Sequence, residues 1–222
     1  MIYPYFLLNY DKKVSKITNQ EGYPLNIVLD DDLASKAIEL SGDSVKINDL
    51  FNNIIANSGY SWATGSYLED RESILSQYEQ MSIDKRYFHL GIDICLPAGE
   101  PIYAPLDATV EETGYEKGEG NYGGYVVLKH EIEDVEPFYV MFGHMSLDSL
   151  PKTGERLVSG DVVARIGDLH ENGGWNHHTH IQIITEEGRK QGYFFKGYCS
   201  EKDLKIIDSL CPSPVPLLTA GR

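Results

Sequence analysis

The chain has 222 residues, a hydrophobic content of 41% and a formal net charge of −15 at pH 7. This length suits one well-buried domain or a domain with an extension, and no apolar run approaches the roughly 18 to 20 residues that a membrane helix needs. A surface this acidic, without a basic patch to offset it, repels nucleic acid and anionic lipid, so we expect no nucleic-acid partner and no membrane span.

The start of the chain, MIYPYFLLNYDKK, has no basic region ahead of its short apolar stretch and therefore predicts no signal peptide. Cys95, Cys199 and Cys211 are odd in number and far apart, which predicts buried, reduced thiols rather than a disulfide framework or a zinc knuckle. Together these features favour a cytoplasmic location, with export without a cleaved signal left open.

The first 85 residues have a helical character. Residues 30–41 and 47–58 carry apolar residues at helical spacing behind Asp and Asn caps, and Gly59 closes the second segment. Residues 68–81, LEDRESILSQYEQM, predict a third helix.

From about residue 87 the pattern changes to short β-type runs between Gly and Pro turns. Seven strands without intervening helices predict an antiparallel β-sheet or sandwich, at residues 91–96, 100–104, 107–115, 123–131, 137–145, 161–168 and 178–186. After them, EKDLKIIDSLC predicts one helix and PSPVP the end of the fold. We therefore expect a mainly β chain of α+β character, divided into an N-terminal extension (1–85), a core (86–190) and a C-terminal tail packed on that core (191–222).

His89 and Asp93, in HLGID, are candidates for a metal site. On a straight strand this spacing would separate them by about 13 Å, which is too far for two side chains to share one ion. The sequence therefore predicts a bend at Gly91, where the missing side chain also leaves room beside the ion.

His178 and His180, in HTHIQI, lie two residues apart on a predicted strand, so both face the same side, about 6.6 Å apart. Three of these four residues could hold one zinc ion with a position open for water, while the fourth handles protons, which predicts a metallohydrolase. We interpret His130, His170 and His177 as ordinary histidines. The loop residues expected to border the substrate groove are Asn121, Tyr122, Gly123, Gly173 and Gly174.

Five segments in order resemble the lysostaphin-type (LytM-like) zinc metalloendopeptidases over about residues 86–185. The segment 89–110, HLGIDICLPAGEPIYAPLDATV, is similar to the family's H-x-G-x-D region and the stretch after it. GGYVVLKH, MFGHMS, GERLVSGDVVARIGD and HTHIQI follow at the places of the family's later segments.

The resemblance implies that His89, Asp93 and His180 bind Zn²⁺ and that His144 and His178 are the two non-ligand histidines beside the reacting water. It also implies an antiparallel β-sheet groove, and a peptide or peptidoglycan as the substrate. Zinc would lower the pKa of water toward about 7, His178 would accept the proton, and His144 would stabilise the oxyanion or protonate the leaving amine.

The chain departs from the family pattern at three positions. Phe142 replaces a Tyr, Met145 replaces a Leu, and Gln182 stands where the family often has Phe or Glu. The loss of the Tyr hydroxyl puts one contribution to transition-state stabilisation in doubt.

Two alternatives to a wall-cutting enzyme stay open: a catalytically silent LytM-like binding or regulatory module, and a zinc hydrolase of a non-wall intracellular peptide or amide. A purely structural zinc site is disfavoured, because the pattern supplies two extra histidines and no fourth protein ligand. The sequence leaves the oligomeric state unknown, along with the identity of the bond that is cut.

Overall fold

The computed structural model describes residues 1–221, and its N-terminal helices follow the predicted pattern. Helix α1 spans Asp31–Glu39 and helix α2 spans Ser44–Ser58. The side chain of Asp30 accepts a hydrogen bond from the Leu33 amide and caps α1, while Asp43 caps α2 in the same way. Gly59 ends α2 in the left-handed conformation, at a φ of 80°. Both predicted helices are confirmed.

The predicted third helix over 68–81 is wrong. Two short turns replace it, α3 at Glu72–Leu75 and α4 at Glu79–Ser82. The amide of Leu68 donates to the carbonyl of His89, and the amide of His89 donates to the carbonyl of Glu69. Residues 68–71 therefore run alongside strand β3 (Arg86–His89), and this pairing takes backbone groups that a helix would need.

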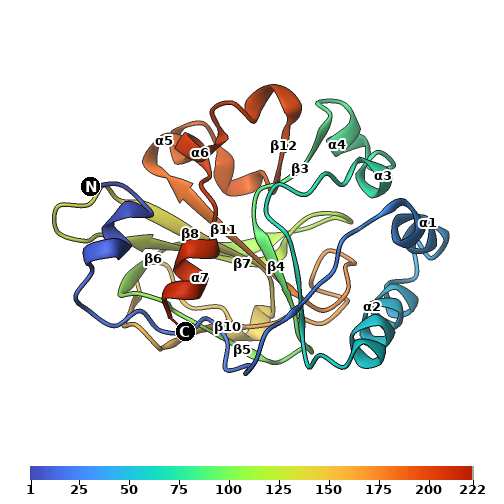
Figure 1. The fold of residues 1–222 in the computed structure, drawn as a ribbon, viewed down its shortest axis with the longest axis horizontal. Coiled ribbons are helices and arrows are strands. Elements are labelled where there is room, and N and C mark those ends of the chain that lie inside the picture. The colour runs from blue at the N-terminus through green and yellow to red at the C-terminus, as the bar shows by residue number, and fades with distance from the viewer. Residues whose placement is uncertain (222) are drawn as a thin grey trace.

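The main sheet has eight strands in the order β1-β2-β4-β11-β8-β7-β6-β9 (Figure 1). Only the β1–β2 pair is parallel, and the other neighbouring pairs are antiparallel. Two two-stranded sheets accompany it, β5 with β10 and β3 with β12. The mainly β fold class is confirmed, and each of the seven predicted runs contains a strand. The bounds are β1 Leu25–Asn26, β2 Ala63–Gly65, β4 Ile92–Cys95, β5 Pro101–Tyr103, β6 Ala108–Glu116, β7 Gly123–His130, β8 Phe138–Met145, β9 Arg156–Leu157, β10 Val162–Arg165, β11 Thr179–Thr185 and β12 Tyr198–Ser200.

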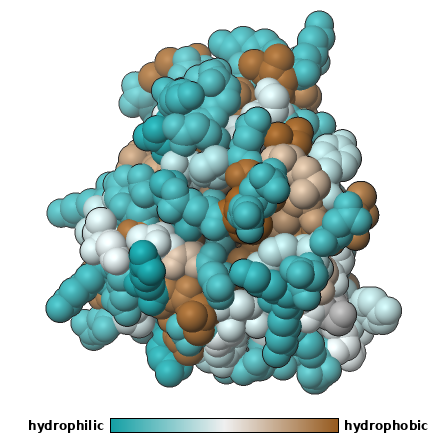
Figure 2. All heavy atoms as spheres, turned by 90° about the vertical axis from the view of Figure 1, so that its left-hand side faces the viewer, coloured by the Kyte–Doolittle hydropathy of each residue, from teal (hydrophilic) through white to brown (hydrophobic). Residues whose placement is uncertain are grey.

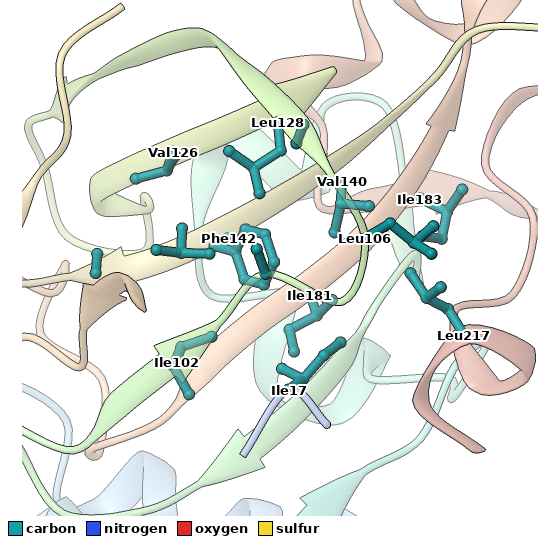
Figure 3. Close-up of a cluster of buried hydrophobic side chains, with 14 of the residues drawn as sticks. Ile17, Ile102, Leu106, Val126, Leu128, Val140, Phe142, Ile181, Ile183 and Leu217 are labelled. Carbon is teal, nitrogen blue, oxygen red and sulfur yellow. The ribbon is translucent and has the colours of Figure 1, made fainter. Parts of the chain in front are cut away.

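The two faces of the main sheet carry different apolar clusters. On one face, Phe142, Ile181 and Ile183 pack with Ile102 of the small β5–β10 sheet (Figure 3). On the other face, Leu90 and Ile184 pack with residues of the C-terminal segment, including Phe194 and Leu210. The alternation along β11 therefore sends Ile181 and Ile183 to the first face and leaves the second face for His180 and Gln182.

The C-terminal segment is more broken than predicted. EKDLKIIDSLC forms a 3-10 turn at Glu201–Asp203 and helix α6 at Ile207–Leu210 rather than one helix. Ser200 is the N-cap of the first turn, and the side chain of Asp203 accepts from its amide. PSPVP does not end the fold, because helix α7, Val215–Ala220, begins within it. Pro216 occupies the first turn of α7, where a proline costs no hydrogen bond. Helix α5 (Glu186–Lys190) and further 3-10 turns at Tyr5–Asn9, Leu147–Ser149 and Tyr193–Phe195 complete the elements.

Segments 1–85 and 191–222 pack against the central sheet. Strand β2, ahead of residue 86, pairs with β4 inside the main sheet, and the tail covers the second apolar cluster. We therefore propose that segments 1–85 and 191–222 are integral layers around segment 86–190 rather than separately folding units.

The surface is mainly polar. In the view of Figure 2, hydrophilic residues dominate and hydrophobic residues occur in small separate groups. Within residues 1–221, no helix combines the length and the apolar character needed to cross a membrane. Cys95, Cys199 and Cys211 are buried free thiols, as predicted.

His130 makes the stability of the fold depend on pH. Its ring is fully buried against Phe138, and its Nδ1 donates to the carbonyl of Asp107 at 2.9 Å. Burial lowers the pKa of His130 from 6.5 to about 4. Between these two values the unfolded chain binds a proton that the folded chain does not, so this contribution to stability is complete above pH 6.5 and is lost as the pH falls.

The substitution His130→Gln removes this titration and keeps an amide that can donate to Asp107. As the pH falls from 6.5 to 4, we expect the unfolding free energy of the wild type to drop faster than that of the variant, by up to about 1.4 kcal/mol per pH unit. Urea titrations at several pH values measure the unfolding free energy of both proteins. The other buried histidines are present in both, so their contributions cancel in the comparison. Parallel pH curves for the two proteins would contradict this role of His130.

Candidate metal centre

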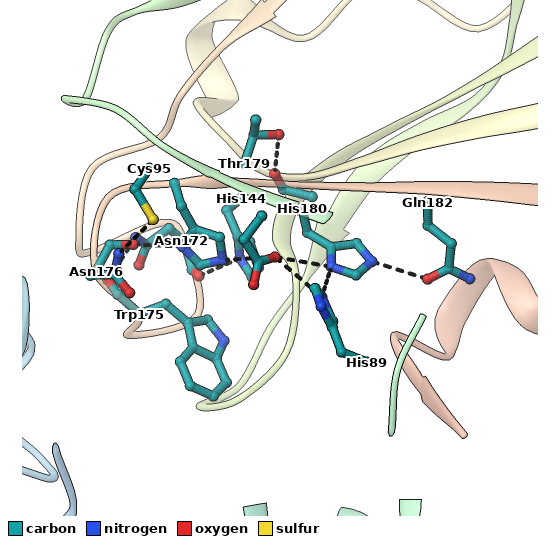
Figure 4. Close-up of polar contacts among 12 residues, drawn as sticks. His89, Cys95, His144, Asn172, Trp175, Asn176, Thr179, His180 and Gln182 are labelled. Atoms are coloured by element: carbon teal, nitrogen blue, oxygen red, sulfur yellow. Dashed lines mark hydrogen bonds and ion pairs between the residues drawn. The ribbon is translucent and has the colours of Figure 1, made fainter. Parts of the chain in front are cut away.

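His89, Asp93 and His180 meet at one point of the structure. Nε2 of His89 lies 2.9 Å from Nδ1 of His180, and each of these nitrogens lies 3.3 Å from Oδ1 of Asp93 (Figure 4). All three side chains are buried. Asp93 and His180 are direct neighbours across the β4–β11 pair, and His89 arrives from the end of β3. The three residues together could hold a metal ion.

Gly91 makes this convergence possible. It lies between the end of β3 and the start of β4, where the chain bends. A Cβ at this position would lie 2.5 Å from Cε1 of His180 and 2.6 Å from the carbonyl oxygen of Ile181. The predicted bend is present, and a side chain at this residue would displace a candidate ligand.

The outer nitrogens of the two histidines fix their tautomers. Nδ1 of His89 donates to the carbonyl of Ser66 at 2.8 Å, because a carbonyl oxygen can only accept. Nε2 of His180 donates to Oε1 of Gln182 at 3.0 Å, since the amide nitrogen of Gln182 is committed to the carbonyls of Tyr193 and Lys196. Metal-binding histidines are commonly held by such outer partners.

This arrangement leaves two lone pairs directed at the same small volume. Burial, reinforced by Arg71, lowers the pKa of His89 to about 4, so its ring is neutral at pH 7 and Nε2 carries a lone pair. Nδ1 of a neutral His180 carries another, and the carboxylate of Asp93 adds an acceptor beside them. Three acceptors without a shared proton repel one another unless a cation lies among them. The donor set, two imidazoles and one carboxylate, fits Zn²⁺.

Arg71 orients the carboxylate ligand. Its Nη2 lies 2.8 Å from Oδ2 of Asp93, its Nε lies 2.9 Å from Glu69, and Nη1 donates to the hydroxyl of Tyr198. The guanidinium therefore holds one carboxylate oxygen of Asp93 and leaves Oδ1 to face the two histidines. Burial alone would raise the pKa of Asp93, but its neighbours His89 and Arg71 outweigh it and lower that pKa well below 3.8.

His144 and His178 lie beside the three candidate ligands. Nε2 of His178 is 3.7 Å from Oδ1 of Asp93, and the rings of His144 and His178 are 4.3 Å apart between centroids. The Nδ1 atoms donate to the carbonyls of Asn172 and Asn176, respectively, each at 2.8 Å. Burial lowers the pKa of both rings below 6.5. Both histidines are thus neutral at pH 7 and carry a lone pair on Nε2.

A local backbone irregularity brings His144 to this face of the sheet. His144 has a φ of 64°, and the β7–β8 register shifts at Gly124 and Tyr125. In a regular strand His144 would share a face with Phe142, which is fully buried in the first apolar cluster. A positive φ in a residue with a side chain costs of order 1–3 kcal/mol, and such strain clusters at functional sites.

The position of Phe142 corrects one expectation. Phe142 pairs with Ile181 and packs in the core on the face opposite the candidate ligands. A tyrosine hydroxyl at this position would point away from the site, so its loss does not bear on transition-state stabilisation. Gln182, the other departure beside the site, supplies the outer partner of His180.

A cavity of about 230 Å³ opens onto the candidate ligands Asp93 and His180 and onto both non-ligand histidines. Of the predicted loop residues, Asn121, Tyr122 and Gly174 line it. Gly123 and Gly173 serve the packing of the loops instead, since a Cβ at either residue would come within 2.0 Å of a carbonyl oxygen of the opposite loop.

The residues that sequence reasoning missed are the outer partners. Ser66 acts through its backbone carbonyl, which no side-chain pattern reveals. The signal for Arg71 is its place in GSYLEDR, where one cation follows two acidic residues. Ser66 and Arg71 both lie ahead of the β-rich region in which the metal pattern occurs.

Comparisons with known proteins identify what this chain is similar to. Residues 87–192 match the model of peptidase family M23. The chain is 33% identical over 95 residues to an uncharacterized metalloprotease of Haemophilus influenzae, an alignment that covers 43% of this chain and 18% of that protein. It is also 33% identical over 79 residues to the peptidoglycan DD-endopeptidase ShyC of Vibrio cholerae, covering 36% of this chain and 16% of ShyC. The chain thus spans less than a fifth of the length of either relative.

Among solved structures, the catalytic domain of lysostaphin from Staphylococcus simulans superposes with a TM-score of 0.42 at 19% identity, covering 60% of this chain and 80% of that domain.

The structure predicts that Arg71 is required for stability. Arg71→Met leaves the buried carboxylates of Glu69 and Asp93 without their cation, and removing one partner of a buried pair costs about 3–5 kcal/mol. Arg71→Lys retains the charge and is expected to lose less. Denaturant unfolding measures both. Arg189→Met, which breaks an exposed pair with Glu186, is the matched control and should change little; equal losses at residues 71 and 189 would contradict the assignment.

Proposed function

Residues 87–192 of this chain belong to peptidase family M23, and on that premise we propose that the chain is a zinc-dependent metallopeptidase that hydrolyses a peptide bond. The observation that carries the proposal is the approach of Nε2 of His89 and Nδ1 of His180, which lie 2.9 Å apart and face each other beside the Asp93 carboxylate. A cation at this point satisfies all three groups, and His89, Asp93 and His180 are the residues that would hold it.

Zinc at such a site lowers the pKa of water from about 15.7 toward about 7 and polarises a carbonyl group. The chain provides three ligands rather than four, which suits a catalytic site with an open position. Arg71, Ser66 and Gln182 keep the ligands oriented through the hydrogen bonds described above.

The two non-ligand histidines handle protons. His178 Nε2 carries a lone pair, so it accepts the proton of the attacking water as a general base. His144 Nε2 also carries a lone pair, which means that His144 donates only after it has taken up a proton. In the protonated form it would stabilise the developing oxyanion or give the proton to the leaving amine. The backbone carbonyls of Asn172 and Asn176 hold the rings in position throughout.

We propose peptidoglycan-type peptides as the substrate class, in line with the name of the Vibrio cholerae relative. One observation favours a second candidate, a non-wall peptide or amide that is smaller than a wall peptide. Side chains from the segment 27–86 line the same cavity as His144, His178 and His180 and restrict it on one side. Incubation with purified peptidoglycan, and separately with short glycine and D-alanine peptides, followed by detection of new amines, distinguishes the two.

The first prediction concerns the metal. Protein purified without added metal is expected to hold near one zinc per chain, and His180→Ala is expected to lose it, because two ligands cannot retain the ion against dialysis. Elemental analysis of the dialysed proteins measures the content. His170→Ala, at an exposed residue, is the control. Zinc retained at full content by His180→Ala would show that the ligand assignment is wrong.

The second prediction concerns proton transfer. His178→Ala is expected to keep its zinc and to lose hydrolysis by about 10²–10⁴-fold, the contribution usual for a general base. His177→Ala is the matched control, since His177 is the adjacent residue and pairs with Asp168 outside the ligand set. Hydrolysis rates and zinc content are measured on the same samples. A fully active His178→Ala protein would remove this residue from the mechanism.

A further inference from the structure

We propose that the substrate carries an apolar side chain beside the scissile bond and that this side chain enters a chamber built by the segment ahead of the family domain. The inference rests on the proposed function and specifies its substrate class. The chamber is the part of the cavity bounded by an apolar wall, which we define as Ile27, Leu29, Ala37, Phe51, Ile74 and Met81.

The apolar wall and the metal centre share one cavity. Asp93, His144, His178 and His180 line one side of the 230 Å³ space, and the apolar wall lines another. Every residue of the wall precedes residue 87, where the match to the peptidase family begins. The wall is therefore a feature of this chain beyond the matched domain.

The chamber lies between two apolar clusters whose side chains do not fill the space between them. Ala37, Ile74 and Met81 belong to one cluster, and Ile27 and Phe51 belong to another. Leu29 packs against both. Five of the six wall residues are at least nine-tenths buried, yet all six face the cavity. The helices α1 and α2 and the turns α3 and α4 thus hold a preformed apolar space.

The loop whose Asn172 and Asn176 carbonyls hold His144 and His178 links the wall to the metal centre. Trp175 packs against the cluster of Ala37 and Ile74, with its ring 5.8 Å from that of Tyr78. The carbonyl of Trp175 accepts from Asn172, whose own carbonyl holds His144 (Figure 4). Two cationic residues line the cavity: Arg71 is paired with Asp93 and Glu69, and Arg86 donates to the carbonyl of Gln80. The apolar wall itself contains no polar or charged side chain, so this part of the cavity suits an uncharged hydrocarbon group.

An apolar chamber selects by size. One methylene in a hydrophobic pocket changes the specificity of an enzyme by about 10–200-fold. In binding, each buried methylene contributes about fourfold in affinity, the equivalent of about 0.8 kcal/mol. A series of ligands that bind the metal through one group and carry hydrocarbon chains of increasing length can therefore report whether the chamber is present and how long a chain it admits.

The experiment uses the zinc-loaded full chain and straight-chain alkyl hydroxamates of two to eight carbons, with affinities from calorimetry. The hydroxamate group binds zinc in every member of the series, so differences report the alkyl chain alone. We expect affinity to rise about fourfold per methylene over the part of the chain that enters the chamber, and then to level off.

Three variants test whether the gain in affinity per methylene arises in the chamber. Ala37→Leu fills it, and the gain per methylene is expected to disappear. Ala34→Leu is the matched control: Ala34 lies in the same helix and cluster and is equally buried, but it does not line the cavity, so the gain should persist. Met81→Gln makes the wall polar without filling it and covers the case in which Ala37→Leu does not fold. The slope is a ratio of affinities within one protein and does not depend on the folded fraction.

The outcomes separate the inference from the proposed function. Equal affinity across the series for the wild type, or an equal gain in wild type, Ala37→Leu and Met81→Gln, would overturn the apolar side-chain proposal and leave hydrolysis untouched. A rising series without turnover of any peptide would support the chamber and count against the hydrolase. Loss of the gain in Ala37→Leu but not in Ala34→Leu supports the proposal.

Discussion

The structure of the site depends on one constraint: the inner nitrogens of two imidazoles lie 2.9 Å apart beside a carboxylate. The tautomer of each ring is set from outside, that of His89 by the Ser66 carbonyl and that of His180 by the Gln182 amide oxygen. Such a cluster of acceptors is unfavourable by itself and favourable around a cation. By engaging the outer nitrogens, the surrounding fold leaves the inner nitrogens and the carboxylate facing one another, an arrangement that suits a cation.

Much of the fold, and part of the candidate site, could be predicted from the sequence because they follow from strand periodicity. The two-residue spacing of His178 and His180 and the glycine between His89 and Asp93 made a shared metal site conceivable, and the resemblance to the peptidase family selected His89, Asp93 and His180 as its ligands. The strand runs of the core each contained a strand, since alternation and turn residues are local signals. The helices capped by Asp30 and Asp43 were equally local.

The failures came where distant pairing overrode local preference. Residues 68–71 have a helical pattern but lie along β3, and that contact depends on a strand further along the chain. Strand alternation alone would also misplace His144, because it puts this residue on the face of Phe142 and only the left-handed backbone reverses it. The family resemblance, rather than the strand pattern, predicted His144 beside the site. Likewise, no sequence pattern marks a carbonyl such as that of Ser66 as the partner of a buried ring.

The position of Ser66 and Arg71 ahead of residue 87 has a consequence for how such a module can be exchanged between proteins. The ligand candidates lie inside the stretch that resembles other peptidases, whereas the groups that set their tautomer and orientation lie outside it. Recombination at the apparent edge of the domain would carry the candidate ligands into a new setting without the neighbours that hold them. The physical module is thus longer than the recognisable one, and its inheritance requires that both parts travel together.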